Sequence, residues 1–212
     1  DTNSLTVLSG AEFELYKTTN PQYWEVVLED GSTFDAANSS DNSGQNRWAG
    51  PVQLNGAVTL TGGSGFYATL LGAISGSGPL NKTGSGATIT IGSTNNTYTG
   101  ATLISAGTLA VSNLASVGEA SSLGQPGNAA DGTIKLGSTS NSRALTYYGN
   151  GVTTDRILDM AGTTGGAIVN HSTQGLLKFV NDVTTSGSGA KTLSLGGSFG
   201  GSGELSGSIN NS

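Results

Sequence analysis

Residues 80–91 read LNKTGSGATITI, and residues 105–111 read SAGTLAV. In both stretches a glycine precedes a segment in which aliphatic residues occupy every second position. The alternating aliphatic residues are Ile89, Ile91, Leu109 and Val111. Alternation of this kind is typical of a β-strand that buries one face and turns threonine or serine outward. Both stretches therefore predict short, half-buried strands.

The composition of the whole chain agrees with this prediction. Glycine, serine, threonine and asparagine make up about half of the 212 residues, and only 10% are charged, against about 25% in ordinary globular domains. The formal net charge of −6 and the many β-branched residues argue against disorder. Further alternating pairs recur along the chain: Leu5/Val7, Phe13/Leu15, Val52/Leu54, Val58/Leu60, Ile134/Leu136, Leu145/Tyr147 and Leu193/Leu195. We therefore expect an all-β protein with many tight turns.

Strands this short fit a sandwich, a barrel or a β-solenoid, and two observations favour the solenoid. The 2 Trp, 6 Tyr, 5 Phe and 1 Met supply few bulky side chains for a two-sheet core, whereas a solenoid coil stacks a few aliphatic residues on its neighbours. Residues 71–80 also recur in part as residues 196–205, which indicates a super-repeat. At roughly 20–25 residues per coil, residues 1–212 predict a single segment of about 9–10 coils. Neither end shows a polar cap, so we expect an uncapped segment of a longer array.

Residues 11–35 differ from the rest of the chain. They contain five of the aromatic residues and an Asn20-Pro21 turn signal, and they predict an inserted hairpin. Tyrosine and tryptophan are common anchors of interfaces. We therefore name Tyr16, Tyr23 and Trp24 as partner-binding candidates. The alternative is that the aromatic residues pack the insertion against the flank of the solenoid.

The sequence offers little for catalysis or cofactor binding. The chain has no cysteine and one histidine, His171, and no Gly-x-Ser-x-Gly motif precedes a helix. The best acidic grouping, with Tyr23 and Trp24 nearby, comprises Glu25, Glu29, Asp30 and Asp35. It is better explained as a solvated face than as a glycosidase site. Residues 187–192 match only the last positions of a phosphate-binding loop motif. We expect no catalytic residue, no cofactor and no metal site.

The basic residues are also few. The 8 lysines and arginines are scattered, which argues against nucleic-acid binding. No apolar run reaches the ~18 residues of a membrane helix. We therefore expect no direct membrane insertion of this segment.

The stretch quoted first resembles a known repeat. The order Leu-x-Lys-x-Gly-x-Gly, apolar strand, Asn-Thr-Tyr-Thr-Gly-x-Thr and x-Ala-Gly-Thr-Leu is similar to the autotransporter-associated β-strand repeat, and the sharpest unit is 76–111. The repeat positions are Lys82, Gly84, Gly86, Asn96, Tyr98, Thr99, Gly100, Gly107, Thr108 and Leu109. In this sequence the first aliphatic residues come three and five positions after Gly86, one later than usual. This shift predicts a bulge near Ala87 and Thr88, or a turn with a different phase.

The resemblance implies a right-handed parallel β-helix that is exported through the outer membrane of a Gram-negative-type bacterium. The expected function is therefore a non-catalytic structural or adhesive passenger segment at the cell surface or outside the cell. Its candidate partners are a second copy, side by side or end to end, and a surface protein or glycan. The alternative is a β-helical polysaccharide lyase or hydrolase, or a glycan-binding module. An enzyme would need acids to converge with one of the arginines, Arg47, Arg143 or Arg156.

Overall fold

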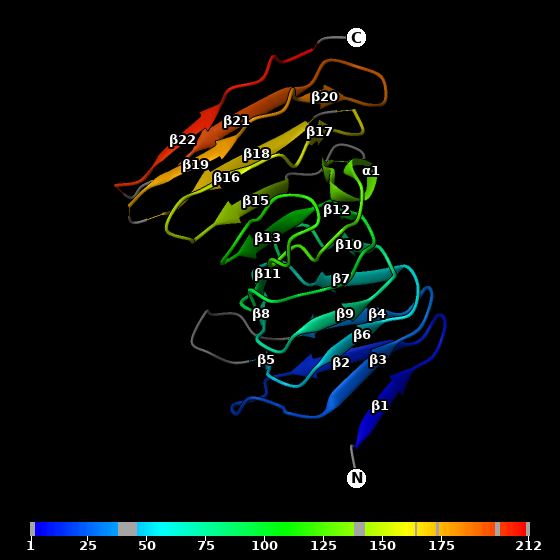
Figure 1. The fold of residues 1–212 in the computed structure, drawn as a ribbon. Coiled ribbons are helices and arrows are strands. Elements are labelled where there is room, and N and C mark those ends of the chain that lie inside the picture. Colours follow the sequence, from blue (N-terminus) through cyan, green and yellow to red (C-terminus); the bar gives the residue numbers. More distant parts are fainter. Residues whose placement is uncertain are drawn as a thin grey trace.

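The computed structural model describes residues 3–37, 46–137, 143–163, 165–172, 174–197 and 200–210. This part of the chain winds into a right-handed parallel β-helix of about 8 turns, which confirms the predicted fold class (Figure 1). The N- and C-termini lie at opposite ends of the axis. The turns are fewer than the 9–10 expected because one turn is long and several others exceed 25 residues. In the long turn Thr102 pairs with Ile134, and Gly107 pairs with Arg143. Val26 with Val52 and Gly165 with Thr192 are examples of the others.

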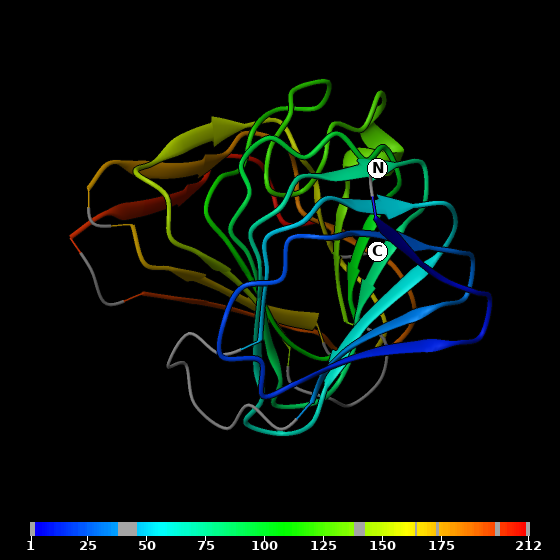
Figure 2. The ribbon, with the colours of Figure 1, turned by 90° about the horizontal axis from the view of Figure 1, so that it is seen from below.

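Each turn contributes strands to as many as three faces, which Figure 2 shows from one end. The first face consists of two separate sheets. In both sheets a strand comes before the second-face strand of the same turn, where that turn has one. In the N-terminal turns it consists of β1 (Ser4–Val7), β3 (Glu25–Leu28), β6 (Val52–Leu54) and β9 (Ile74–Gly76). In the C-terminal turns it consists of β16 (Val152–Thr154), β19 (Leu176–Phe179) and β22 (Ser202–Leu205).

The second and third faces run along most of the molecule. The second face consists of β2 (Glu12–Tyr16), β4 (Thr33–Ala37), β7 (Val58–Gly62), β10 (Leu80–Lys82), β12 (Thr102–Ile104), β14 (Ile134–Leu136), β17 (Leu158–Met160) and β20 (Thr184–Thr185). The third face consists of β5 (Arg47–Trp48), β8 (Tyr67–Leu70), β11 (Thr88–Ile91), β13 (Gly107–Val111), β15 (Arg143–Tyr147), β18 (Gly165–Asn170) and β21 (Thr192–Gly196). The pairs between these strands are parallel.

The core is a set of columns of inward side chains. On the third face Ile89 lies opposite Ala68 on one side and Leu109 on the other, and all three are buried. Leu145 continues the same column. The neighbouring outward residue Thr90 is only partly buried. The period-two pattern therefore identifies the inward residues of these strands correctly.

The phase shift after Gly86 is absorbed in the turn and not in the strand. Gly84 and Gly86 have φ values of +76° and +86°, which glycine adopts without steric cost. β11 then pairs continuously with both neighbours, and Ile89 and Ile91 are fully buried. Of the two expectations, the turn with a different phase is the one that forms.

The hairpin expected at residues 11–35 is wrong. β2 pairs in parallel with β4, and β3 pairs in parallel with β1 and β6, so this stretch forms regular turns of the solenoid. The aromatic residues that suggested an insertion belong partly to the core. The ring centroid of Phe13 lies 5.5 Å from that of Phe34 and 5.1 Å from that of Trp48. Asn20-Pro21 lies in the long segment 17–24 between β2 and β3, and not in a tight turn.

One long excursion interrupts the first face. Residues 112–133 lie between β13 and β14 and include the short helix α1 (Ala129–Gly132). Here the first face has no strand, and Asn96 instead forms an antiparallel bridge with Ser121. Leu114 and Leu123 of the excursion are buried in the core. The excursion is therefore part of the packed structure.

The glycine that begins β13 gives a test of the stacking. Gly107 has a φ of +68°, and a Cβ atom there would overlap the carbonyl oxygens of Gly84 and Ala87 in the previous turn. We expect Gly107→Ala to lower the free energy of unfolding by about 2–4 kcal/mol, because it combines backbone strain with a clash against backbone atoms. Urea unfolding followed by circular dichroism measures the change.

Gly127→Ala is the matched control. A Cβ atom at Gly127 has no neighbour within 4 Å, so this variant should change the free energy of unfolding by less than about 0.5 kcal/mol. Equal effects of the two substitutions would contradict the close approach of the turns at Gly107.

Candidate functional site

The corner between the second and third faces holds a buried cation. Lys82 ends β10, and its side chain is fully buried. Its Nζ donates to the carbonyl oxygens of Thr83 and Gly84 in its own turn, the latter at 3.3 Å, and to that of Ala106 in the next turn, also at 3.3 Å. Burial lowers the pKa of the Lys82 ammonium to about 8. The side chain therefore ties two turns together through backbone oxygens.

The side chain of Asn96 forms hydrogen bonds to two other segments of the chain at a point where the first face lacks a strand. Its Oδ1 accepts from the backbone N–H of Ile74 at 2.8 Å, and its Nδ2 donates to the carbonyl oxygen of Ser122 at 3.0 Å. The amide is buried. Asn96 therefore connects β9 in one turn with the excursion in the other.

Tyr98 is buried beside Asn96. Its hydroxyl forms a hydrogen bond of 2.9 Å with Oγ1 of Thr102, and burial raises the pKa of Tyr98 to about 12. A ring that is wholly buried cannot serve as a platform for a ligand. Tyr98 packs the corner in front of β12.

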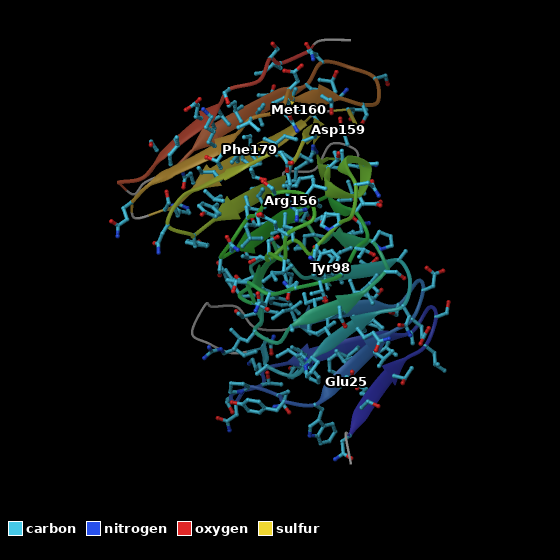
Figure 3. All side chains as sticks on the ribbon, viewed as in Figure 1. Glu25, Tyr98, Arg156, Asp159, Met160 and Phe179 are labelled. Carbon is cyan, nitrogen blue, oxygen red and sulfur yellow. The ribbon has the colours of Figure 1, made fainter. Side chains whose placement is uncertain are left out.

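Arg156 fixes the excursion from the following turn. It is 2% exposed, its Nε donates to the carbonyl oxygen of Ala115 at 2.8 Å, and its Nη2 donates to that of Gly124 at 3.0 Å. The side chain also bonds Oγ of Ser121 at 3.2 Å. Tyr98 and Arg156 lie in the central turns (Figure 3). No local signal in the sequence points to this role, because the partners precede Arg156 by 32–41 residues.

The other repeat positions also have structural roles. A Cβ atom at Gly100 would overlap the backbone of Gly78, and the N–H of Thr99 donates to the carbonyl oxygen of Gly76 at 3.0 Å. Thr108 pairs with Thr88, and Leu109 is buried in the core. The repeat unit therefore supplies contacts between turns.

The three aromatic candidates for partner binding lie at the N-terminal end of the solenoid. Tyr16 is 59% exposed, Tyr23 is 71% exposed and Trp24 is 61% exposed. Tyr16 ends β2, while Tyr23 and Trp24 directly precede β3. Their side chains are therefore not buried against the side of the solenoid. They are the largest exposed aromatic surface of the first turn.

The acidic residues grouped by sequence are separated by the fold. Glu29 accepts from Nδ2 of Asn55 and Asp30 from the N–H of Ala57, between the first and second faces. Glu25 lies on the first face. Asp35 lies on the second face, where burial and then the nearby Glu12 raise the pKa of its carboxyl group. The expected grouping therefore forms no single site.

The arginines do not complete an acidic site either. Arg143 and Arg156 are buried, and Nη1 of Arg143 donates to the carbonyl oxygen of Gly165 at 2.6 Å. Arg47 lies on the third face. In the part of the chain that the structure describes, no group of three or more His, Asp or Glu side chains is arranged to hold a metal ion.

The remaining candidates from the sequence have local partners. The His171 ring stacks on the ring of Tyr148, with centroids 5.3 Å apart and planes at 20°. In the stretch 187–192, Nζ of Lys191 donates to the carbonyl oxygens of Gly187 at 3.1 Å and Ser188 at 3.4 Å. The lysine thus faces carbonyl oxygens of its own loop. Among the described residues, no helix is long and apolar enough to cross a membrane.

The stability of the protein should depend on pH through Lys82. The folded-state pKa of about 8 lies below the 10.5 of an unperturbed lysine, so the unfolded chain binds more protons between these values. The free energy of unfolding should therefore rise as the pH increases from about 8 to 10.5, by at most about 3 kcal/mol. Urea unfolding at a series of pH values measures this rise.

Lys82→Met should lose this rise and should also be less stable, because three carbonyl oxygens lose their donor. Lys191→Met is the control, since Lys191 also donates to carbonyl oxygens but is only partly buried. It should keep the pH profile of the original chain. The assignment would be wrong if Lys82→Met kept that profile too.

Comparison with known proteins gives no relative from which a function could be inferred, so the inference depends on the geometry of the chain. No protein-family model, no curated protein and no solved structure matches the chain. The buried polar residues connect turns, and three exposed aromatic residues, Tyr16, Tyr23 and Trp24, lie close together in the sequence of the first turn. These two features are the basis for a function.

Proposed function

We propose that the chain is a non-catalytic structural and adhesive segment of a bacterial surface-exposed or secreted protein of the autotransporter type. The observation that carries this proposal is the role of its unusual polar residues. Lys82, Asn96 and Arg156 are each buried and bonded to the backbone of another turn. These residues hold a rod together, and their side chains are out of reach of a substrate.

The resemblance of residues 76–111 to the autotransporter-associated repeat supports export to the cell surface. Its lysine and glycines meet at one corner: Lys82 bonds the carbonyl oxygen of Gly84, and Gly107 packs against both. The motif therefore has a physical reason, which is to close a corner and join the next turn. A rod built from such turns suits a passenger that extends away from a cell.

The adhesive part of the proposal concerns Tyr23 and Trp24. Exposed tyrosine and tryptophan bury much area at little entropic cost, and they are frequent hot spots of interfaces. With a net charge of −6, the chain has no electrostatic attraction for nucleic acid. We therefore propose a protein or glycan surface as the partner.

The double variant Tyr23→Ala/Trp24→Ala tests this surface. Beads coated with the chain are passed over immobilised mucin and immobilised fibronectin, and the retained fraction is counted. We expect the double variant to lose at least about tenfold in retention, because tenfold corresponds to only about 1.4 kcal/mol and a single hot spot contributes more than that. Unfolding of the variant should match that of the original chain, because both side chains are exposed.

Tyr148→Ala is the control for the loss of an exposed aromatic ring elsewhere, since Tyr148 is 54% exposed and far along the chain. It should leave retention unchanged. If the double variant is retained as well as the original chain, adhesion through Tyr23 and Trp24 is refuted.

The absence of catalysis is tested separately. The chain is incubated with polygalacturonate, alginate and chondroitin sulfate, and the formation of reducing ends or unsaturated products is followed. We expect no product above the buffer control, because the acids and arginines do not converge on one face. Release of oligosaccharides from any of these polymers would support the enzyme alternative.

A further inference from the structure

Four positions of the chain combine an asparagine or aspartate side chain with a following glycine. They are Asp30-Gly31, Asn55-Gly56, Asp131-Gly132 and Asn150-Gly151. In such a pair the backbone nitrogen of the glycine can attack the γ-carbon of the preceding side chain, because glycine has no Cβ atom to hinder the approach. A carboxylate is negatively charged and resists this attack, whereas a neutral amide does not. The two asparagine pairs are therefore the candidates for a chemical change of the chain itself.

The availability of the attacking N–H group separates the pairs. In three of them the glycine N–H donates to an oxygen atom: Gly31 to the carbonyl of Ala57 at 2.7 Å, Gly132 to that of Asn128 at 2.9 Å, and Gly151 to the phenol of Tyr147 at 3.2 Å. An N–H group held in this way must leave its acceptor before the nitrogen can attack. The N–H of Gly56 has no acceptor within the described part of the chain. Asn55-Gly56 is thus the asparagine pair with an available nucleophile.

The surroundings of the Asn55 side chain also favour the attack. Asn55 is exposed, and it lies between β6 and β7 at the corner that joins the first and second faces. Its Oδ1 accepts from Nε2 of Gln53 at 2.7 Å, and its Nδ2 donates to Oε1 of Glu29 in the preceding turn at 2.8 Å. The donor on Oδ1 stabilises the negative charge that this oxygen gains when the γ-carbon is attacked. The exposure of the corner lets water reach the product.

We propose that Asn55 is a modification site at which the chain deamidates without an enzyme. The nitrogen of Gly56 loses its proton to water or hydroxide and forms a bond to the γ-carbon of Asn55. The bond from this carbon to Nδ2 breaks, and the amide nitrogen takes up a proton and leaves as ammonia. A five-membered succinimide ring remains. Water then opens the ring at one of its two carbonyl groups and gives isoaspartate or aspartate, so water is the only co-reactant.

The reaction changes a contact between two turns inside the rod. The strand before the site, β6, has β3 on one side and β9 on the other (Figure 1). Before the reaction Nδ2 of Asn55 donates to the carboxylate of Glu29, and afterwards two carboxylates face each other and repel. An isoaspartate also adds a methylene group to the main chain directly after Leu54, which pairs with Leu28. The modification therefore weakens this contact with time, and it does not depend on the adhesive function proposed above.

The second asparagine pair serves as an internal control. The folded chain is kept in mildly alkaline buffer, samples are denatured and digested with trypsin, and mass spectrometry with fragmentation follows the replacement of the amide NH₂ by OH. Trypsin separates the two pairs, since residues 48–82 and 144–156 each follow a basic residue and end at the next one. We expect Asn55 to deamidate at least about fivefold faster than Asn150, because the N–H of Gly151 must first leave Tyr147.

Two further measurements test the physical reason. In the chain unfolded in guanidinium chloride the two rates should become similar, because the hydrogen bond to Tyr147 is lost there. Tyr147→Phe removes the acceptor of Gly151, so in the folded chain it should raise the rate at Asn150 by about fivefold and leave the rate at Asn55 unchanged. Circular dichroism checks that the variant is folded, and an unchanged rate at Asn150 in the folded variant would overturn the proposal.

The comparison within the original chain decides the proposal even if Tyr147→Phe does not fold. Equal rates at Asn55 and Asn150 in the folded chain would overturn it. The proposal would also be wrong if Asn55 reacted in the unfolded chain but stayed intact in the folded one over the same time.

Discussion

The constraint on which the structure depends is the parallel register between successive turns. A strand inside one of the sheets is hydrogen-bonded to the strands of the same face in the turn before and the turn after, so its inward positions belong to columns that run along the axis. A displacement of one residue would turn a whole strand inside out. The chain keeps the register although the spacing between partners varies, from Ile89–Leu109 to the much longer Leu109–Leu145. The corners and the excursion absorb this variation outside the columns.

Corners that vary in length create a second requirement, which is a hydrogen-bond donor for each buried carbonyl oxygen. These oxygens are removed from water, but no neighbouring strand supplies an N–H group to them. A buried carbonyl group without a donor is costly. The chain meets this cost with cations, since lysine has three donors and arginine has five. Three of its 8 basic residues, Lys82, Arg143 and Arg156, are buried and donate to backbone oxygens. The scarcity of charge on the surface is thus partly a consequence of how the corners are closed.

The sequence predicts the solenoid because its signals are local. Alternating pairs such as Ile89/Ile91 identify inward residues, and left-handed glycines such as Gly84 identify corners. Which strand lies beside which is not local, since it depends on the number of residues in the intervening turn. For this reason Asn20-Pro21 suggested a hairpin where a long connection lies, and the number of turns was overestimated. The role of Arg156 was hidden in the same way, because its partners lie in an excursion whose path no short motif encodes.

The same architecture limits where a solenoid can recognise anything. Its faces repeat the same short strands, and outward residues such as Thr88, Thr90 and Thr108 present similar small polar side chains from one turn to the next. Distinct chemistry arises where the repetition stops, as it does in the excursion. The excursion is fixed in place by Arg156, and its aliphatic residues Leu114 and Leu123 face the core. In a parallel solenoid each strand gains both hydrogen bonds and buried apolar area from the turns beside it, so the excursion adds to the core without breaking the columns of the other two faces.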